Sequence, residues 1–213
     1  MARVKVPDYS LKEELINAIS HGVGAVFSVV ALILCILKAH TTIGLVSSII
    51  YTTIMILLYV ISCVYHALSP RVKGKKVLRV IDHCNVMLMV AGTYMPVCLA
   101  LIGGTLGFSV FTIVWIITIV GVVFNAINVD KYQMISAICN LLLGWGIMFL
   151  VNPILKVCPM QGVWFLLFGG ISYTIGSVLY AMGSKVPYAH SIFHFFVLIG
   201  CLFHFLFIYL YCI

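Results

Sequence analysis

Long apolar stretches separated by short polar connections make up most of this chain. Seven of them are long enough to cross a bilayer, at residues 20–37, 44–67, 79–101, 106–128, 132–151, 162–183 and 188–211. A membrane-spanning helix needs about 20 mostly apolar residues. Residues that disturb helix interiors fall between the stretches, as at Pro70, Pro159 and the Gly103-Gly104 pair. The pattern therefore predicts an all-α membrane protein, a bundle of seven transmembrane helices.

The first 19 residues are more polar than the rest and carry charges of both signs. Ser10 and Glu13 form an S-x-x-E capping box, which is a signature of a helix amino terminus. Apolar residues then recur at a spacing of four, so we expect a helix to begin near residue 10 on the membrane surface and to lead into the first span. We therefore predict a cytoplasmic amino-terminal segment over residues 1–19 and a single transmembrane domain over residues 20–213.

The composition excludes an ordinary soluble protein. Of the residues, 64% are hydrophobic and 8% are charged, whereas soluble domains have about 45–50% and about 25%. The formal net charge of +7 would suggest nucleic-acid binding in a soluble protein, but here the basic residues lie between the apolar stretches and set the topology. We expect no nucleic-acid partner. The eight cysteines contain no C-x-x-C pair, so neither a disulfide scaffold nor a zinc ribbon is indicated.

The distribution of Lys and Arg predicts the orientation, because short basic loops stay on the cytoplasmic side. With the amino terminus inside, only Lys38 and Lys156 lie toward the outside. Ten basic residues then lie on the inner side: Arg3, Lys5, Lys12, Arg71, Lys73, Lys75, Lys76, Arg79, Lys131 and Lys185. The sequence thus predicts a cytoplasmic amino terminus and, after an odd number of spans, a carboxyl terminus outside.

Polar residues gather at the inner ends of three predicted spans. Ser62 and His66 lie one helical turn apart in the second span, and His190 and His194 lie one turn apart at the start of the seventh. Asp82 lies at the same depth in the third span. Ionisable groups within a membrane are costly unless they are paired, hydrated or functional. Three imidazoles, a carboxylate and a hydroxyl are therefore expected in one layer of the bundle.

Three neutral imidazoles are a typical ligand set of catalytic zinc, which keeps its fourth position for water. We therefore predict a zinc ion bound by His66, His190 and His194. An H-x-x-x-H spacing alone is a weak signal, because a single histidine in this setting is more often interfacial or hydrogen-bonded between helices. The shared depth with Asp82 is what favours a metal.

Asp82 and Ser62 are the predicted catalytic residues, and each has an alternative interpretation. Asp82 either acts on the metal-bound water, caps the third span, or pairs with Arg79 three residues earlier. Ser62 either joins the site or hydrogen bonds to the carbonyl four residues earlier. The roles of three further histidines stay open: His21, His83 and His204.

The ordered combination of these motifs resembles the hemolysin III proteins of bacteria, within the progestin and adipoQ receptor superfamily. The likeness covers nearly the whole chain. It is carried by Glu13-Glu14, Asn17 and Ser20-His21, by Ser62-x-x-x-His66, by Arg79-Val-Ile-Asp82-His83 and Ala91-Gly92-Thr93-Tyr94-x-Pro96, and by His190-x-x-x-His194.

The resemblance implies a seven-helix membrane protein that holds zinc through three histidines near the cytoplasmic side, which correspond to His66, His190 and His194. It also implies that Asp82 contacts the zinc-bound water and that Ser62 is its neighbour. The similarity of the superfamily to alkaline ceramidases suggests hydrolysis of a lipid amide, an activity that belongs to relatives.

We therefore predict a multi-pass protein of the cell membrane, with zinc as cofactor and membrane lipids as partners, that hydrolyses a lipid amide or ester near the cytoplasmic leaflet. Asp82 would serve as the general base, and Ser62 would orient the water or the substrate carbonyl. The alternative is a receptor or membrane-homeostasis regulator in which the zinc is structural. A pore-forming hemolysin is less favoured, because the outer half offers few polar groups to line a pore.

Overall fold

The computed structural model describes residues 4–213, with the side chain of Ser184 left out. Arg3, one of the ten basic residues used for the orientation, lies outside the described residues. Within residues 4–213 the regular structure is helical and contains no β-strand, which confirms the all-α prediction. The α-helices are α1 (Leu11–Lys38), α2 (Thr42–Ala67), α3 (Gly74–Met95), α4 (Gly104–Gly146), α5 (Val151–Leu155), α6 (Met160–Met182) and α7 (Ala189–Tyr211).

Shorter helical segments join these elements. A π-helix continues α3 over Pro96–Ile102, one 3-10 segment (Ile147–Leu150) leads into α5, and another (Gly183–Lys185) precedes α7. The predicted turn at Gly103 and Gly104 is present, with φ of 63° and 59°, a conformation that glycine adopts without strain. The predicted capping box is also present. The Ser10 hydroxyl accepts a hydrogen bond from the Glu13 backbone N–H, and the Glu13 carboxylate accepts one from the Ser10 backbone N–H.

Six helical segments of the described chain are long and apolar enough to cross a membrane: Leu11–Lys38, Thr42–Ala67, Gly74–Ile102, Gly104–Leu155, Met160–Met182 and Ala189–Tyr211. The protein is therefore a multi-pass membrane protein. Five of these segments match predicted spans closely. The segment Gly104–Leu155 covers two predicted spans in one run of 52 residues.

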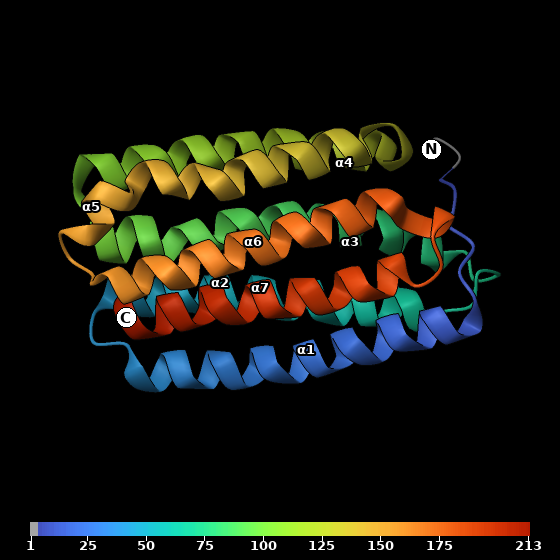
Figure 1. Cartoon of the computed structure of the whole chain (residues 1–213), viewed down its shortest axis with the longest axis horizontal. Helices are drawn as coiled ribbons and strands as arrows, with labels where there is room; N and C mark the ends of the chain where they lie inside the picture. The colour runs from blue at the N-terminus through green and yellow to red at the C-terminus, as the bar shows by residue number, and fades with distance from the viewer. Residues whose placement is uncertain (1–3) are drawn as a thin grey trace.

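The helix α4 consists of two arms that lie side by side. Asn128 has non-helical dihedral angles, φ −157° and ψ 89°, and the chain reverses its direction there (Figure 1). Contacts between the arms fix the reversal: Ser136 Oγ donates to Asn125 Oδ1 over 2.9 Å, and the rings of Phe124 and Tyr132 lie 5.0 Å apart. The two predicted spans are thus separated by one non-helical residue and no loop.

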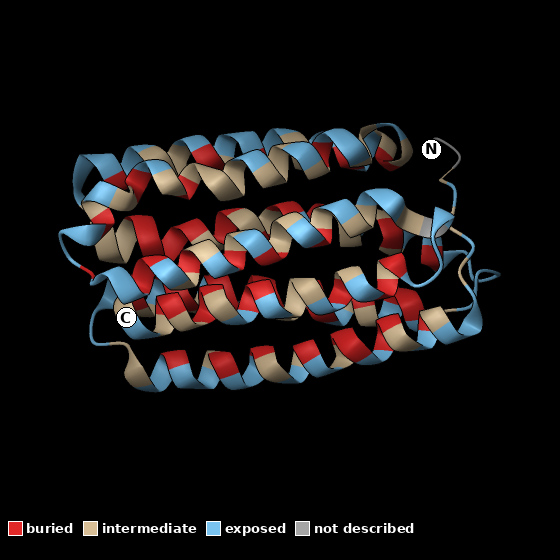
Figure 2. Cartoon of the chain, viewed as in Figure 1, coloured by how far each residue is buried: buried red, intermediate tan, exposed pale blue. Residues whose placement is uncertain are grey.

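The helices form a ring in which α1 packs between α2 and α7. The helix α3 packs against α2 and α4, and α6 packs against α7. The core is built from large buried side chains such as Tyr51, Tyr59 and Phe207. The outward faces of the helices expose apolar residues, as expected for contact with lipid (Figure 2). The start of α1 and the carboxyl terminus lie at opposite ends of the bundle (Figure 1).

Candidate metal centre

Three histidines from two helices meet at the end of the bundle where α1 begins. His66 lies in the last turn of α2, and His190 and His194 lie in the first turns of α7. One ring nitrogen from each lies within 4.8 Å of the other two. We call these residues the histidine cluster. The structure therefore brings together the three residues that the sequence predicts as metal ligands.

The donor atoms of the histidine cluster fit a metal ion. Nε2 of His66 is buried and has no hydrogen-bond partner among the described residues, and the Nε2 atoms of His190 and His194 lie 3.2 Å apart. Buried polar atoms in native proteins are almost always satisfied, so such atoms need an explanation. Neutral imidazole nitrogens are common ligands of zinc and related divalent ions. A bound metal would account for the unpartnered nitrogen of His66 and for the close approach of the nitrogens of His190 and His194.

A carboxylate from α1 orients one member of the cluster. Glu14 Oε2 lies 2.6 Å from Nδ1 of His66, and Glu14 Oε1 lies 2.5 Å from Nζ of Lys75. The Lys75 ammonium is fully buried and also donates to the Leu68 carbonyl oxygen over 2.8 Å. When His66 donates from Nδ1 to Glu14, its Nε2 remains free to bind a metal.

From the sequence, Glu14 is identified only as part of the family motif Glu13-Glu14. Lys75 is identified only as one of the basic residues that predict the orientation in the membrane. In the structure they form one ion pair that joins α1 and α3 to His66 on α2. The spacing of Glu14, Asn17 and His21 is the sequence signal that was available. Residues seven apart share a face of a helix, so this stripe of polar residues marks the side of α1 that turns inward.

Asp82 and Ser62 line the same cavity as His190 and His194. Because α3 begins at Gly74, Asp82 lies about two turns inside it, and the helix-cap interpretation is wrong. The pairing with Arg79 is also wrong, since Arg79 Nη1 contacts Asp130 Oδ1 over 2.5 Å. The Asp82 carboxylate is thus left facing the cavity, with 16% of its side chain exposed.

His21 completes this region as a fourth histidine. Its ring stacks on that of His194 with centroids 3.7 Å apart, and its two nitrogens are buried without a partner among the described residues. The lone pairs of an imidazole lie in the plane of the ring, so two stacked rings do not point at one ion. His21 therefore covers His194 and is not grouped with the metal ligands.

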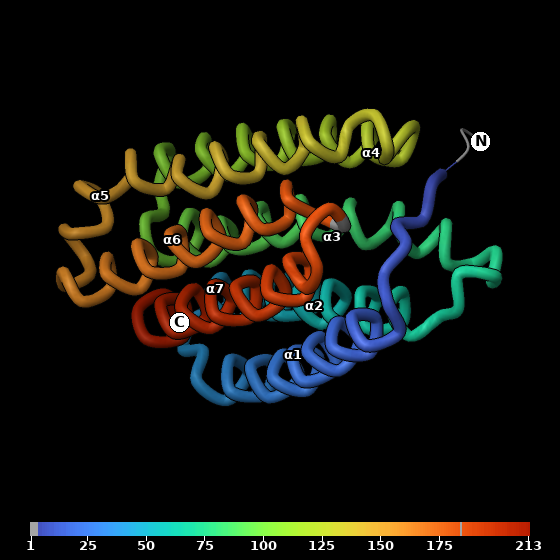
Figure 3. The backbone as a smooth tube through the Cα atoms, turned by 45° about the vertical axis from the view of Figure 1, so that its right-hand side comes forward, coloured from blue at the N-terminus to red at the C-terminus, as the bar shows by residue number. Residues whose placement is uncertain are grey.

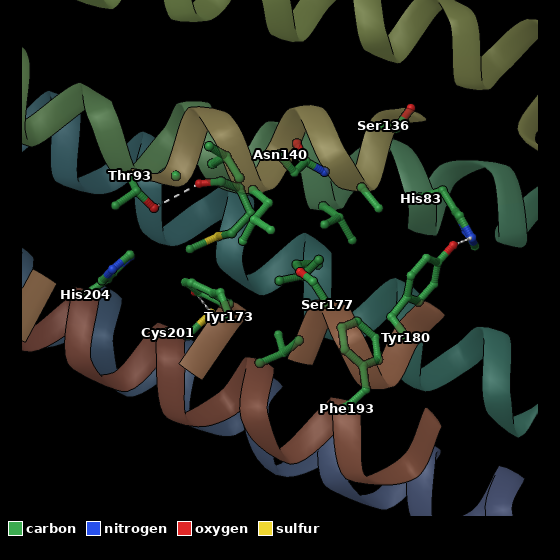
Figure 4. Close-up of a pocket in the computed structure, with 18 of the residues that line it drawn as sticks. His83, Thr93, Ser136, Asn140, Tyr173, Ser177, Tyr180, Phe193, Cys201 and His204 are labelled. Atoms are coloured by element: carbon green, nitrogen blue, oxygen red, sulfur yellow. Dashed lines mark hydrogen bonds between the residues drawn. The ribbon is translucent and has the colours of Figure 1, made fainter. Parts of the chain in front are cut away.

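The other two open histidines lie outside the cluster. The nitrogens of His83 lie 2.8 Å from the Arg79 carbonyl oxygen and 3.1 Å from the Tyr180 hydroxyl (Figure 4). His204 lies toward the opposite end of the cavity (Figure 4) and packs on Gly169, where a Cβ atom would fall 2.2 Å from its Cδ2. The glycine in α6 thus permits the close approach of α7.

An apolar cavity of about 160 Å³ extends from the histidines into the bundle. Side chains of α3, α6, α7 and the second arm of α4 line it, and it runs from His83 and Tyr180 toward Thr93 and His204 (Figure 4). An apolar cavity with a few polar groups converging at one place is typical of ligand sites. Here the converging groups are Ser62, Asp82 and the histidines.

The segment before α1 crosses the end of the bundle next to the cluster (Figure 3). We call residues 4–9 the amino-terminal strap. The Lys5 backbone N–H donates to Asp130 Oδ2 over 2.9 Å, and the Tyr9 ring stacks on His190 with centroids 4.9 Å apart. Burial raises the pKa of the Tyr9 phenol above its ordinary value, so the phenol stays protonated. Sequence reasoning finds no signal for this contact.

Comparisons with known proteins give matches over most of the chain. A family model described as "Haemolysin-III related" matches residues 9–205. "Hemolysin-3 homolog" of Bacillus subtilis (strain 168) is 35% identical over 208 residues, covering 96% of this chain and 97% of the relative. "Hemolysin-3" of Bacillus cereus is 36% identical over 194 residues, covering 89% and 87%.

A more distant match comes from animals. "Monocyte to macrophage differentiation factor" of Homo sapiens is 26% identical over 158 residues, covering 70% of this chain and 63% of that protein. No solved structure gives a significant match.

Proposed function

The chain belongs to the haemolysin-III-related family of membrane proteins, and we propose that it is a zinc-dependent hydrolase of a lipid amide or ester. The resemblance found from the sequence motifs is thereby confirmed. The observation that carries the proposal is the convergence of ring nitrogens of His66, His190 and His194, within 4.8 Å of one another, beside a carboxylate, a hydroxyl and an apolar cavity. A metal that served only to tie helices together would need neither the carboxylate nor the cavity.

The topology that goes with this function has seven spans. A straight helix of 52 residues would be about 78 Å long, more than twice the roughly 30 Å hydrocarbon core, so we assign one crossing to each arm of α4. The basic residues near the amino-terminal end of the bundle support a cytoplasmic amino terminus. The carboxyl terminus then lies outside, and the histidine cluster lies near the cytoplasmic leaflet.

His66, His190 and His194 would hold the metal, and Glu14 would fix the ring orientation of His66 through the bond to Nδ1. When bound, zinc supplies a Lewis acid that activates water and polarises a substrate carbonyl. The ion pair with Lys75 keeps Glu14 in place at the back of the site, away from the substrate.

Asp82 is placed to act as general base. Its carboxylate faces the cavity without a salt bridge to Arg79, so it can accept a proton from water and deliver it to the leaving nitrogen or oxygen. The Ser62 hydroxyl lines the same cavity and can donate a hydrogen bond to the substrate carbonyl oxygen. The apolar cavity would take the first part of the acyl chain, with the remainder reaching the surrounding lipid.

The direct test is turnover by the purified, zinc-loaded protein on dodecanoyl amides and esters presented in an uncharged detergent. We expect release of dodecanoate by the wild type, loss of that activity in His194→Ala, and its retention in the control His40→Ala, which changes an exposed histidine outside the cluster and the cavity. A zinc-loaded wild type that hydrolyses none of these compounds would contradict the hydrolase and favour a regulator with structural zinc.

A further inference from the structure

A second chamber, with a larger polar share of its wall than the apolar cavity, adjoins the histidine cluster. It has a volume of about 190 Å³, and we call it the vestibule. Its wall includes Pro7 and Tyr9 of the strap, Tyr65 of α2 and Lys185 of the segment before α7. Five residues line both the vestibule and the apolar cavity: Asp82, His83, Gln133, Tyr180 and His190. The two spaces therefore meet at the metal ligand His190 and the proposed base Asp82.

Several side chains on the vestibule wall can donate hydrogen bonds. The hydroxyls of Tyr9 and Tyr65 and the ammonium of Lys185 have no hydrogen bond to another described side chain. The oxygen of the Gln133 amide is occupied by Arg79 and Tyr180, which leaves its N–H₂ group as a further donor. The ionised acceptor is Asp82, which the proposed reaction uses. A ligand with acceptor oxygens would satisfy these donors.

The aromatic rings could instead suggest a cage for a cationic group, because tyrosine faces attract cations. The contacts of the rings argue against it. One face of Tyr9 is covered by His190, and the ammonium of Lys75 lies 5.1 Å from the ring centroid of Tyr65. Lys185 and a bound metal would give the chamber positive charge, Arg79 is paired with Asp130, and Asp82 would offset one unit of that positive charge. An anionic group is thus favoured over a cationic one.

The volume limits the size of that group. An apolar cavity of about 150 Å³ holds a benzene molecule, so the vestibule has room for roughly six to eight non-hydrogen atoms. That is the size of a small amino acid and much smaller than an oligosaccharide.

We propose that the vestibule binds the carboxylate-bearing head of an N-acylated small amino acid, with the acyl chain in the apolar cavity and the amide between them at Asp82. This inference deepens the proposed function and rests on it. The reaction would break the amide C–N bond and form a C–O bond to water. Both water protons end on the leaving nitrogen, so acylglycine and water give a fatty carboxylate and zwitterionic glycine. The strap residues Pro7 and Tyr9 then form part of the head-group site.

Three probes of matched size test the head-group specificity: N-dodecanoylglycine, N-dodecanoylethanolamine and N-dodecanoylethylenediamine, which carry a negative, a neutral and a positive head. Their binding to the purified full chain is measured by displacement of tritiated N-dodecanoylglycine in an uncharged detergent. We expect the glycine compound to bind about tenfold tighter than the ethanolamine compound, which is the size of one hydrogen bond to a charged group, and the cationic compound to bind most weakly. Equal binding of the three probes would overturn the proposal.

Variants test whether the carboxylate of the glycine compound binds in the vestibule or directly to the metal. Tyr9→Phe keeps the ring on His190 but removes the hydroxyl, and Lys185→Gln removes the ammonium. Each should reduce the preference for the glycine compound at least threefold, whereas Lys131→Gln, which removes an exposed charge outside the vestibule wall, should leave it unchanged. A preference that survives both substitutions and disappears in His194→Ala would refute the vestibule as the head-group site.

The outcomes also distinguish this inference from the proposed function. Preferential binding of the glycine compound without turnover would uphold the vestibule and contradict the hydrolase. Equal turnover of the glycine and ethanolamine compounds would uphold the hydrolase and contradict the vestibule.

Discussion

Replacing Glu14 by Gln should weaken metal binding although Glu14 is not a ligand. The carboxylate lies 2.6 Å from His66 Nδ1, a charge-assisted hydrogen bond that fixes which nitrogen His66 offers. Removing such a partner typically lowers metal affinity about 10–100-fold, which corresponds to about 1.4–2.7 kcal/mol. The amide introduced by Glu14→Gln could still accept a hydrogen bond, but without the charge.

The same substitution has a second effect on stability, and a double variant separates the two. Lys75 is fully buried, and loss of its anionic partner should cost about 3–5 kcal/mol of unfolding free energy. In Glu14→Gln/Lys75→Met no charge of this buried pair remains, so stability should recover. The metal affinity should stay low, because His66 still lacks its carboxylate.

The assay is competition for zinc against a chelator of known affinity at pH 7, with thermal unfolding measured on the same samples. The matched control is Glu13→Gln, because Glu13 contacts Ser10 and the Tyr188 backbone N–H but no histidine. We expect wild-type zinc affinity in this control. Recovery of full zinc affinity by the double variant would refute the reasoning, since Glu14 would then act only through the fold.

Four further perturbations test the same geometry. Alanine at His66, His190 or His194 should remove most of the bound zinc, as measured by elemental analysis. The control His204→Ala should retain its zinc. Undiminished zinc in His194→Ala would exclude the assigned ligand set. Asp82→Asn should hold zinc at saturating metal and lose about 10²–10⁴-fold in turnover, and full activity would exclude Asp82 as the base. Reporter fusions should place residues 70–76 in the cytoplasm, and an outside location would reverse the proposed topology. Gly24→Ala should destabilise by about 1–3 kcal/mol in thermal unfolding, because its Cβ would lie 2.5 Å from the Tyr59 ring, whereas Gly144→Ala, with no atom within 4 Å, should be neutral.

The sequence by itself determined the helical class, the positions of most spans and the candidate ligands. Membrane insertion selects for apolar length, and that property is local, so it can be read from consecutive residues. The pairing of Ser62 with His66 and of His190 with His194 follows from the helical repeat alone. The shared depth of these residues with Asp82 follows from counting spans, which is why the triad meets as expected.

Only the tertiary structure decided how these residues are supported. Glu14, Lys75 and His66 come from three helices, and their contact depends on how each helix is rotated and which helices are neighbours. Arg79 binds Asp130 in place of nearby Asp82, because the reversal at Asn128 brings that carboxylate to α3. The stacking of Tyr9 on His190 and of His21 on His194 depends on the same inter-helix arrangement. A one-dimensional pattern fixes the face of a helix but not its partner, so these contacts appear only when the bundle is assembled.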